Sequence, residues 1–193
     1  MREAVIAERL ERRRDMLDEI TPSRLEKLRK GLIDVTAPES QRGSVASTVA
    51  EAMAQAGKRA RHLRTAIESA GGIYLPERLH RVRIEAKKLR YALEIQRELT
   101  RSRSRLHLNR LKTQQSLLGR MHDLEILIDR TRAVQATLAA RNRRGMGELD
   151  ALIRVLGDEC REGHATYMHA RPALLKLCES VIDTVRQSRS TAA

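Results

Sequence analysis

The segment from Leu79 to Ile95, LHRVRIEAKKLRYALEI, carries basic side chains at a spacing that suits the binding of a polyanion. In a helix that turns by about 100° per residue, four of them fall within about 80° of one another. These four residues are His80, Arg83, Lys87 and Arg90, which we call the basic ladder. Beside them the helix places an apolar stripe made of Val82, Ala86, Leu89 and Leu93. Because the basic ladder adjoins this core-facing stripe, we expect it to form the wall of a pocket.

The chemistry of the basic ladder fits a chain of phosphates. Its ten-residue span corresponds to about 15 Å of helix, which is long enough for several consecutive phosphates. Arginine offers a planar fork of donors, lysine a compact charge, and histidine a donor that becomes cationic beside an anion. Glu94 lies on the same face and offsets part of the charge. A solvated helix surface is the alternative interpretation of such a run of charges.

Positive charge is concentrated in the middle of the chain. The 193 residues contain 38 Lys and Arg against 25 Asp and Glu, a net charge of +13. Residues 58–112 alone hold 16 basic and 5 acidic side chains, whereas residues 1–57 hold 10 of each. A basic segment between nearly neutral flanks indicates a site for a polyanion.

Composition narrows the class of protein further. Only 2% of the residues are aromatic, with three Tyr and no Phe or Trp, and no strand-like alternation is visible. No apolar run reaches the roughly 18–20 residues of a membrane span, and the N-terminus lacks the apolar centre of a signal peptide. Two cysteines, Cys160 and Cys178, do not make a disulfide scaffold. We therefore expect an all-α protein of the cytoplasm, without membrane contact.

Turn-forming residues divide the chain into helices. We expect helices over 2–18, from Pro22 to a close at Gly31 and Pro38, over 44–70 and over 76–100. Gly119 is expected to separate a helix from Leu106 and a helix over 121–140, and Pro172 to separate helices over 147–169 and 172–188. The fold expected is an antiparallel bundle of about seven to eight long helices. Its domains are an N-terminal pair of helices (1–33), a linker (34–43) and a bundle (44–193).

Two stretches of the chain resemble the CHAD family, a helical domain named for its histidine. The first resembles the family signature that reads roughly L-H-x-x-R-x-x-x-K-x-x-R-Y-x-x-E. It matches at Leu79, His80, Arg83, Lys87, Lys88, Arg90, Tyr91 and Glu94. The second, LKTQQSLLGRMHDLEIL, resembles the family segment LK-x-x-Q-x-x-LG-x-x-x-D. It matches at Leu111, Lys112, Gln115, Leu118, Gly119 and Asp123.

This resemblance implies non-catalytic binding of inorganic polyphosphate between two helical halves. The implied polyphosphate ligands are His80, Arg83, Lys87, Lys88 and Arg90, with support from Lys58, Arg61 and Lys112. The implied orienting residues are Tyr91, Glu94 and Asp123. Residues 1–33 resemble the helices that end the first half of the family domain, and residues 44–193 resemble its second half. An association with polyphosphate granules follows from the same resemblance.

Part of the family domain has no counterpart in this chain, because residues 1–57 contain no first-half basic helix. A single half would leave inward helix faces exposed, and exposed apolar patches commonly mark interfaces. We therefore expect a homodimer in which each copy supplies a basic wall that the other lacks. A separate protein that donates the missing half is the alternative.

Other chemistries have less support from the residues. No H-E-x-x-H, C-x-x-C, G-x-S-x-G or phosphate-loop motif is present, so we expect no metal, no cofactor and no catalytic residues. The chain also has no Glu-x-Glu, which the triphosphate-processing domains often fused to CHAD segments require. Nucleic acid is the weaker alternative ligand, because the same cations attract it but aromatic stacking platforms are scarce. A regulatory or accessory subunit of a phosphate-metabolising enzyme is the other alternative.

Overall fold

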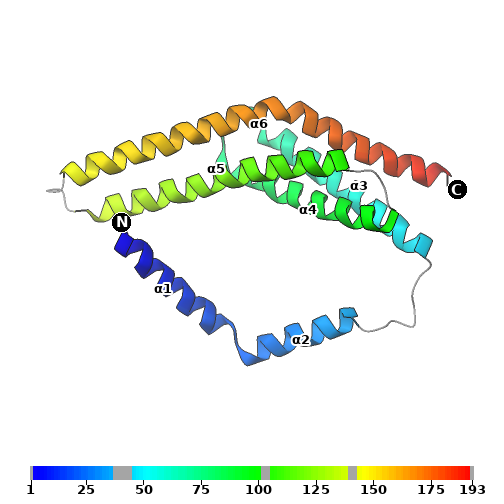
Figure 1. Ribbon diagram of the computed structural model, residues 1–193, viewed down its shortest axis with the longest axis horizontal. Helices are drawn as coiled ribbons and strands as arrows, with labels where there is room; N and C mark the ends of the chain where they lie inside the picture. Colours follow the sequence, from blue (N-terminus) through cyan, green and yellow to red (C-terminus); the bar gives the residue numbers. More distant parts are fainter. Residues whose placement is uncertain (1, 37–44, 101–104, 139–142, 192–193) are drawn as a thin grey trace. The chain divides into compact units, whose positions relative to one another are not determined.

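The computed structural model describes residues 2–36, 45–100, 105–138 and 143–191, and all its elements there are helices (Figure 1). They are α1 (Arg2–Glu19), α2 (Pro22–Thr36), α3 (Val45–Ala70), α4 (Pro76–Thr100), α5 (Arg105–Thr137) and α6 (Arg143–Thr191). The all-α prediction is confirmed. The chain divides into a first unit, Met1–Gly43, and a second unit, Ser44–Ala193. Within the described residues, none of the helices combines the length and apolarity needed to cross a membrane.

Local signals account for the helix ends that lie nearest the basic ladder. Gly71 takes a left-handed backbone conformation (φ 65°) and donates to the carbonyl of Glu68 at 3.2 Å, which closes α3. Pro76 then opens α4, where a missing N–H costs nothing. The expected bounds of this helix, 76–100, are therefore confirmed.

Two expected helix breaks are wrong, and the described residues form six helices instead of the seven to eight expected. α5 continues through Gly119, because the adjoining Leu118 and Met121 are buried and their packing outweighs the low helix propensity of glycine. α6 continues through Pro172, whose flanks are anchored by the buried Tyr167 and Leu174. Proline removes one hydrogen bond and bends a helix, and Figure 1 shows α6 bent along its length.

The expected linker also differs from the structure at its start. α2 continues through Gly31 as far as Thr36, so the first three residues of the predicted 34–43 linker are helical. Residues 37–43 lie outside the described residues, as do residues 101–104 of the expected Arg/Ser loop.

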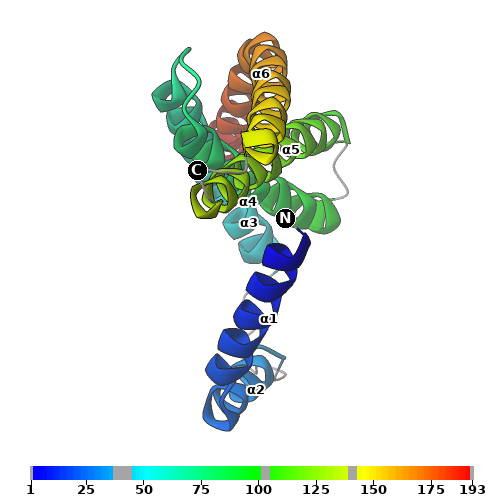
Figure 2. The same cartoon turned by 90° about the vertical axis from the view of Figure 1, so that its left-hand side faces the viewer.

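The second unit is an antiparallel four-helix bundle, seen nearly end-on in Figure 2. α4 packs against α3 and α5, and α6 packs against the same two helices from the other side. Small residues let α3 approach its neighbours closely, and a Cβ added at Gly57 would lie 3.2 Å from Val185 Cγ2. The apolar stripe of α4, including Val82 and Leu89 at 0% exposure, faces the core of this bundle. This packing fixes the rotation of α4 and therefore the direction of the basic ladder.

Candidate functional site

The basic ladder lies along the seam between α4 and α5. The His80 ring stands 4.4 Å from the His122 ring, centroid to centroid. One α4 turn further on, Arg83 lies over Gly119, and after two more turns Arg90 reaches Gln115. The residue numbers of the α5 partners fall as those of the basic ladder rise, because the two helices are antiparallel. The seam thus brings His80, Arg83 and Arg90 each beside a residue of α5.

Arg90 is the most firmly held member of the basic ladder. Its Nε donates to Gln115 Oε1 at 2.9 Å, and its Nη1 donates to Glu94 Oε1 at 2.7 Å. The guanidinium carbon also lies 4.6 Å from the centre of the Tyr91 ring, a cation–π geometry. Glu94 and Tyr91, both implied as orienting residues, therefore contact Arg90.

Arg83 lies across α5 at Gly119. A Cβ built at Gly119 would lie 3.5 Å from Arg83 Nε and 4.0 Å from its Nη2. Hydrogen at this position leaves room for the arginine to lie across the neighbouring helix. Lys87, between Arg83 and Arg90, is exposed, with its Nζ 5.9 Å from the Tyr91 ring centre.

His80, at one end of the basic ladder, faces His122 of α5. His80 Nδ1 is buried and has no hydrogen-bond partner among the described residues. Burial, then the charges of His122 and Arg83, lower the pKa of His80, and Glu77 opposes them. Because a lowered pKa favours the neutral imidazole, His80 contributes a donor more readily than a charge until an anion approaches.

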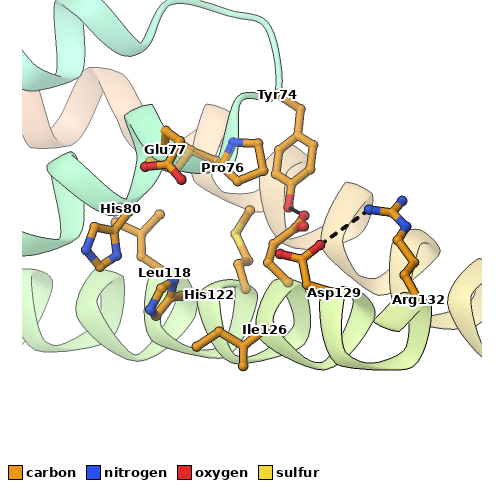
Figure 3. Close-up of a pocket in the computed structure, with 12 residues that line it drawn as sticks. Tyr74, Pro76, Glu77, His80, Leu118, His122, Ile126, Asp129 and Arg132 are labelled. Atoms are coloured by element: carbon orange, nitrogen blue, oxygen red, sulfur yellow. Dashed lines mark hydrogen bonds and ion pairs between the residues drawn. The ribbon is translucent and has the colours of Figure 1, made fainter. Parts of the chain in front are cut away.

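A cavity of about 440 Å³ opens beside this histidine pair (Figure 3). Carboxylates line it from both helices: Glu77 from α4, and Glu125 and Asp129 from α5. The Tyr74 hydroxyl donates to Glu125, and Arg132 pairs with Asp129 at 3.4 Å. Burial and the Glu125 carboxylate raise the pKa of Tyr74. The carboxylates of this cavity therefore lie beyond His80, at the end of the seam away from Arg90.

The remaining predicted cations divide between two places. Lys112 is exposed on α5, in the row whose next members are Gln115, Gly119 and His122. Lys88 points away from this row and binds Glu85 at 2.7 Å, and the same carboxylate lies 3.9 Å from His62 Nδ1 of α3. The structure therefore places Lys88 at the α3–α4 seam, apart from the basic ladder.

Two cations of α3 also stand apart from the basic ladder. Lys58 and Arg61 are exposed, and no hydrogen bond or ion pair in the described residues joins them to it. Asp123 is exposed and likewise has no such bond to the ladder in the described part of the chain. The supporting and orienting roles implied for these three residues stay predictions.

Sequence reasoning assigned no role at the site to three α5 residues that face the basic ladder. Gln115 is predicted only as a motif position, Gly119 as a motif position and a helix break, and His122 is not singled out. A signal was nevertheless present, because residues 112, 115, 119 and 122 repeat at the three- and four-residue spacing of one helix face. What the sequence could not show is that this face meets α4.

The described residues form no site suited to metal binding or to thiol chemistry. No group of three or more His, Cys, Asp or Glu side chains there is arranged to hold a metal ion. Cys160 and Cys178 are unpaired and 1% and 0% exposed, respectively. Burial raises the pKa of Cys178 to about 12, so its thiol stays protonated at neutral pH.

Comparison with known proteins relates the chain to a family of domains. The family model described as CHAD domain matches residues 1–132 of the chain. The matched part contains α1 to α4, the whole basic ladder, and α5 as far as Arg132. α6, which completes the four-helix bundle, lies beyond the match. No curated protein and no solved structure matches the chain.

Proposed function

Because this chain belongs to the CHAD domain family, we propose that it binds inorganic polyphosphate along the basic ladder without catalysing a reaction on it. The observation that carries this proposal is the row of basic side chains at the α4–α5 seam, with His80, Arg83 and Arg90 each backed by an α5 residue. Side chains that are already held in one row lose less conformational freedom when a ligand binds. An extended polyanion gains most from such an arrangement.

The contacts of Arg90 suit a ligand with repeated phosphates. Gln115, Glu94 and the Tyr91 ring hold the guanidinium, while its side chain keeps 21% of its surface exposed. A phosphate oxygen offers this guanidinium a second charge-assisted partner. Arg83 and the exposed Lys87 continue the same row, so consecutive phosphates would meet consecutive cations.

The histidine pair would respond to such a ligand. A phosphate beside His80 favours its protonated form and raises the pKa that burial lowers. His122 faces it across the seam and shares the ligand's field. The acidic cavity beyond the pair repels phosphate, which would confine the chain of phosphates to the Arg83–Arg90 side.

Passive binding is the simplest use of these residues. The basic ladder supplies donors and charge, and the sequence contains none of the metal-binding, nucleophile or phosphate-loop motifs named above. We expect the protein to retain or present polyphosphate, in the cytoplasm and at polyphosphate granules. Incubation with long-chain polyphosphate, followed by gel analysis of its length, tests the absence of hydrolysis, and shortened chains would refute it.

Competition binding separates polyphosphate from nucleic acid as ligand. A labelled long-chain polyphosphate is bound at one fixed salt concentration and displaced with unlabelled polyphosphate, duplex DNA or single-stranded RNA, compared at equal phosphate concentration. We expect polyphosphate to compete at least about tenfold better, because the scarce aromatic side chains offer bases little to stack on. Equal or better competition by either nucleic acid would overturn the proposal.

A further inference from the structure

The first unit exposes apolar side chains along both of its helices. The large apolar side chains between residues 6 and 33 keep between 44% and 64% of their surface exposed. They are Ile6, Leu10, Met16, Leu17, Ile20, Leu25, Leu28, Leu32 and Ile33. No side chain described between residues 6 and 33 is buried. The unit therefore has no core of its own in the described residues.

These side chains have the spacing of amphipathic helices, which bury one apolar face against a neighbour. Ile6, Leu10 and Leu17 share one face of α1, and Leu25, Leu28 and Leu32 share one face of α2. Helices of 18 and 15 residues are marginal in water when they are isolated, because most helical stability comes from burying such a face. The apolar faces of both helices therefore need a partner.

The joint between the two helices is well defined. Thr21 caps α2 by accepting a hydrogen bond from the Arg24 amide at 3.3 Å. The Arg24 side chain reaches back to the carbonyl and the carboxylate of Glu19, at 3.1 and 3.3 Å. The first unit thus presents two helices, each with an apolar face. A four-helix bundle needs four such helices, so two copies of the unit would supply them.

The nearly balanced charge of the first unit favours its association with a second copy of the same unit. Residues 1–43 contain 10 basic and 9 acidic side chains, whereas residues 44–193 contain 28 and 16. Ion pairs within the helices, such as Arg12–Glu8 and Arg29–Glu26, both 2.8 Å, further balance the surface. A surface of balanced charge meets its own copy without net repulsion, whereas the strongly basic second unit would repel its copy.

We propose that α1 and α2 pair with α1 and α2 of a second copy of this chain, forming a two-fold symmetric four-helix bundle. Two-fold pairing uses the same patch on both copies and leaves no apolar face open to further association. This interface is built from the first unit alone and requires no phosphate. It accordingly does not rest on the proposed binding function.

The mass of the full-length protein without polyphosphate tests the interface. Sedimentation velocity and light scattering at tens of micromolar should give twice the 21.9 kDa chain mass. Leu28→Asp places a charge in the apolar face of α2 and should weaken dimerisation by at least about tenfold. Ile95→Asp is the matched control, since Ile95 is 59% exposed on α4, against 64% for Leu28. A monomeric wild type, or an equal loss in both variants, would overturn the proposal.

A labelling experiment keeps the proposal testable even if Leu28→Asp unfolds α2. Because Cys160 and Cys178 are buried, a Ser23→Cys substitution introduces an accessible thiol at the exposed start of α2. A spin label there should show dipolar coupling between copies that fades as unlabelled protein is mixed in. The same label on a Thr184→Cys variant reports on α6 for comparison. Absence of intermolecular coupling at Ser23 would refute the interface, whether the unit is covered by another part of its own chain or left open.

Discussion

Gly119 of α5 faces the guanidinium of Arg83 on α4, and a Cβ at this glycine would lie 3.5 Å from Arg83 Nε. That distance is an ordinary van der Waals contact, so a methyl group fits, whereas a longer side chain would occupy the path of the arginine. The small size of Gly119 therefore leaves the space that the Arg83 side chain occupies.

We expect Gly119→Ala to retain polyphosphate binding and to raise the free energy of unfolding by about 0.5–1 kcal/mol, because alanine is the better helix former. Gly119→Leu should displace Arg83 and weaken binding by at least about tenfold, roughly the value of one charge-assisted hydrogen bond. Urea unfolding and a binding titration measure the two effects. Gly31→Leu, at a helical glycine with nothing within 4 Å, is the control for the larger side chain. Unaltered binding by Gly119→Leu would refute the role given to this space.

The histidines predict opposite effects of pH on folding and on binding. Burial lowers the pKa of His80, His107 and His164 from the ordinary value of 6.5. The unfolded chain therefore binds more protons than the folded one just below pH 6.5, and stability should fall as the pH drops through this range. Urea midpoints measured at about pH 7.5 and about pH 5.5 test this direction.

Polyphosphate affinity should rise over the same fall in pH, because the bound anion raises the pKa of His80 and so stabilises its proton. Glu77 and Arg83 on α4 and His122 on α5 are the charged or titratable groups around it. His80→Gln keeps a hydrogen-bonding side chain but cannot titrate, so its affinity should depend less on pH. An affinity that is independent of pH in the wild type would exclude the histidine from the site.

Packing between α5 and α6 gives a prediction about stability alone. A Cβ at Gly163 would lie 2.8 Å from Met121 Cγ, and Met121 is only 3% exposed. Gly163→Ala should therefore destabilise the bundle by about 1–3 kcal/mol, the usual cost of overpacking. Gly147→Ala in the same helix has nothing within 4 Å and should be neutral or slightly stabilising. Equal unfolding midpoints for the two variants would show that the backbone relaxes around Met121.

Polyphosphate should also strengthen the proposed dimer. A polyphosphate chain that contacts the basic ladders of two copies favours the paired state by mass action, and two linked sites bind more tightly than one. Sedimentation at a protein concentration near the dimerisation midpoint, with long or very short polyphosphate, measures this effect. We expect the dimer fraction to increase with the long chains and to change little with the short ones. A decrease with long chains would contradict the prediction.

Much of the site could be predicted from spacing within one helix. The positions of His80, Arg83, Lys87 and Arg90 relative to the apolar stripe follow from the helical repeat, and Pro76 and Gly71 mark where that helix begins and its predecessor ends. The α5 side of the seam could not be predicted in this way. It depends on the register between two helices, which is set by tertiary packing and not by local propensity.

The errors at Gly119 and Pro172 share a physical cause. Both residues are poor helix formers, so local rules end a helix at each of them. Each is flanked by deeply buried side chains, including Met121 beside Gly119 and Leu174 beside Pro172. Continuing the helix keeps those side chains in the core, and that gain exceeds the local cost. Such a balance becomes visible only when the neighbouring helices are in place.

The most direct test of the basic ladder compares two double variants that remove the same charge. Arg83→Ala/Arg90→Ala removes two ladder residues, and Arg12→Ala/Arg154→Ala removes two exposed arginines from α1 and α6. Titration with long-chain polyphosphate should show a loss of at least about 2 kcal/mol in the ladder variant, since a hydrogen bond to a charged group contributes about 1.5–3 kcal/mol. The control variant should stay near wild type, and the slope of affinity against salt should be shallower in the ladder variant. Equal losses of affinity in the two variants, or wild-type affinity unchanged between low and moderate salt, would contradict a defined polyphosphate site on the basic ladder.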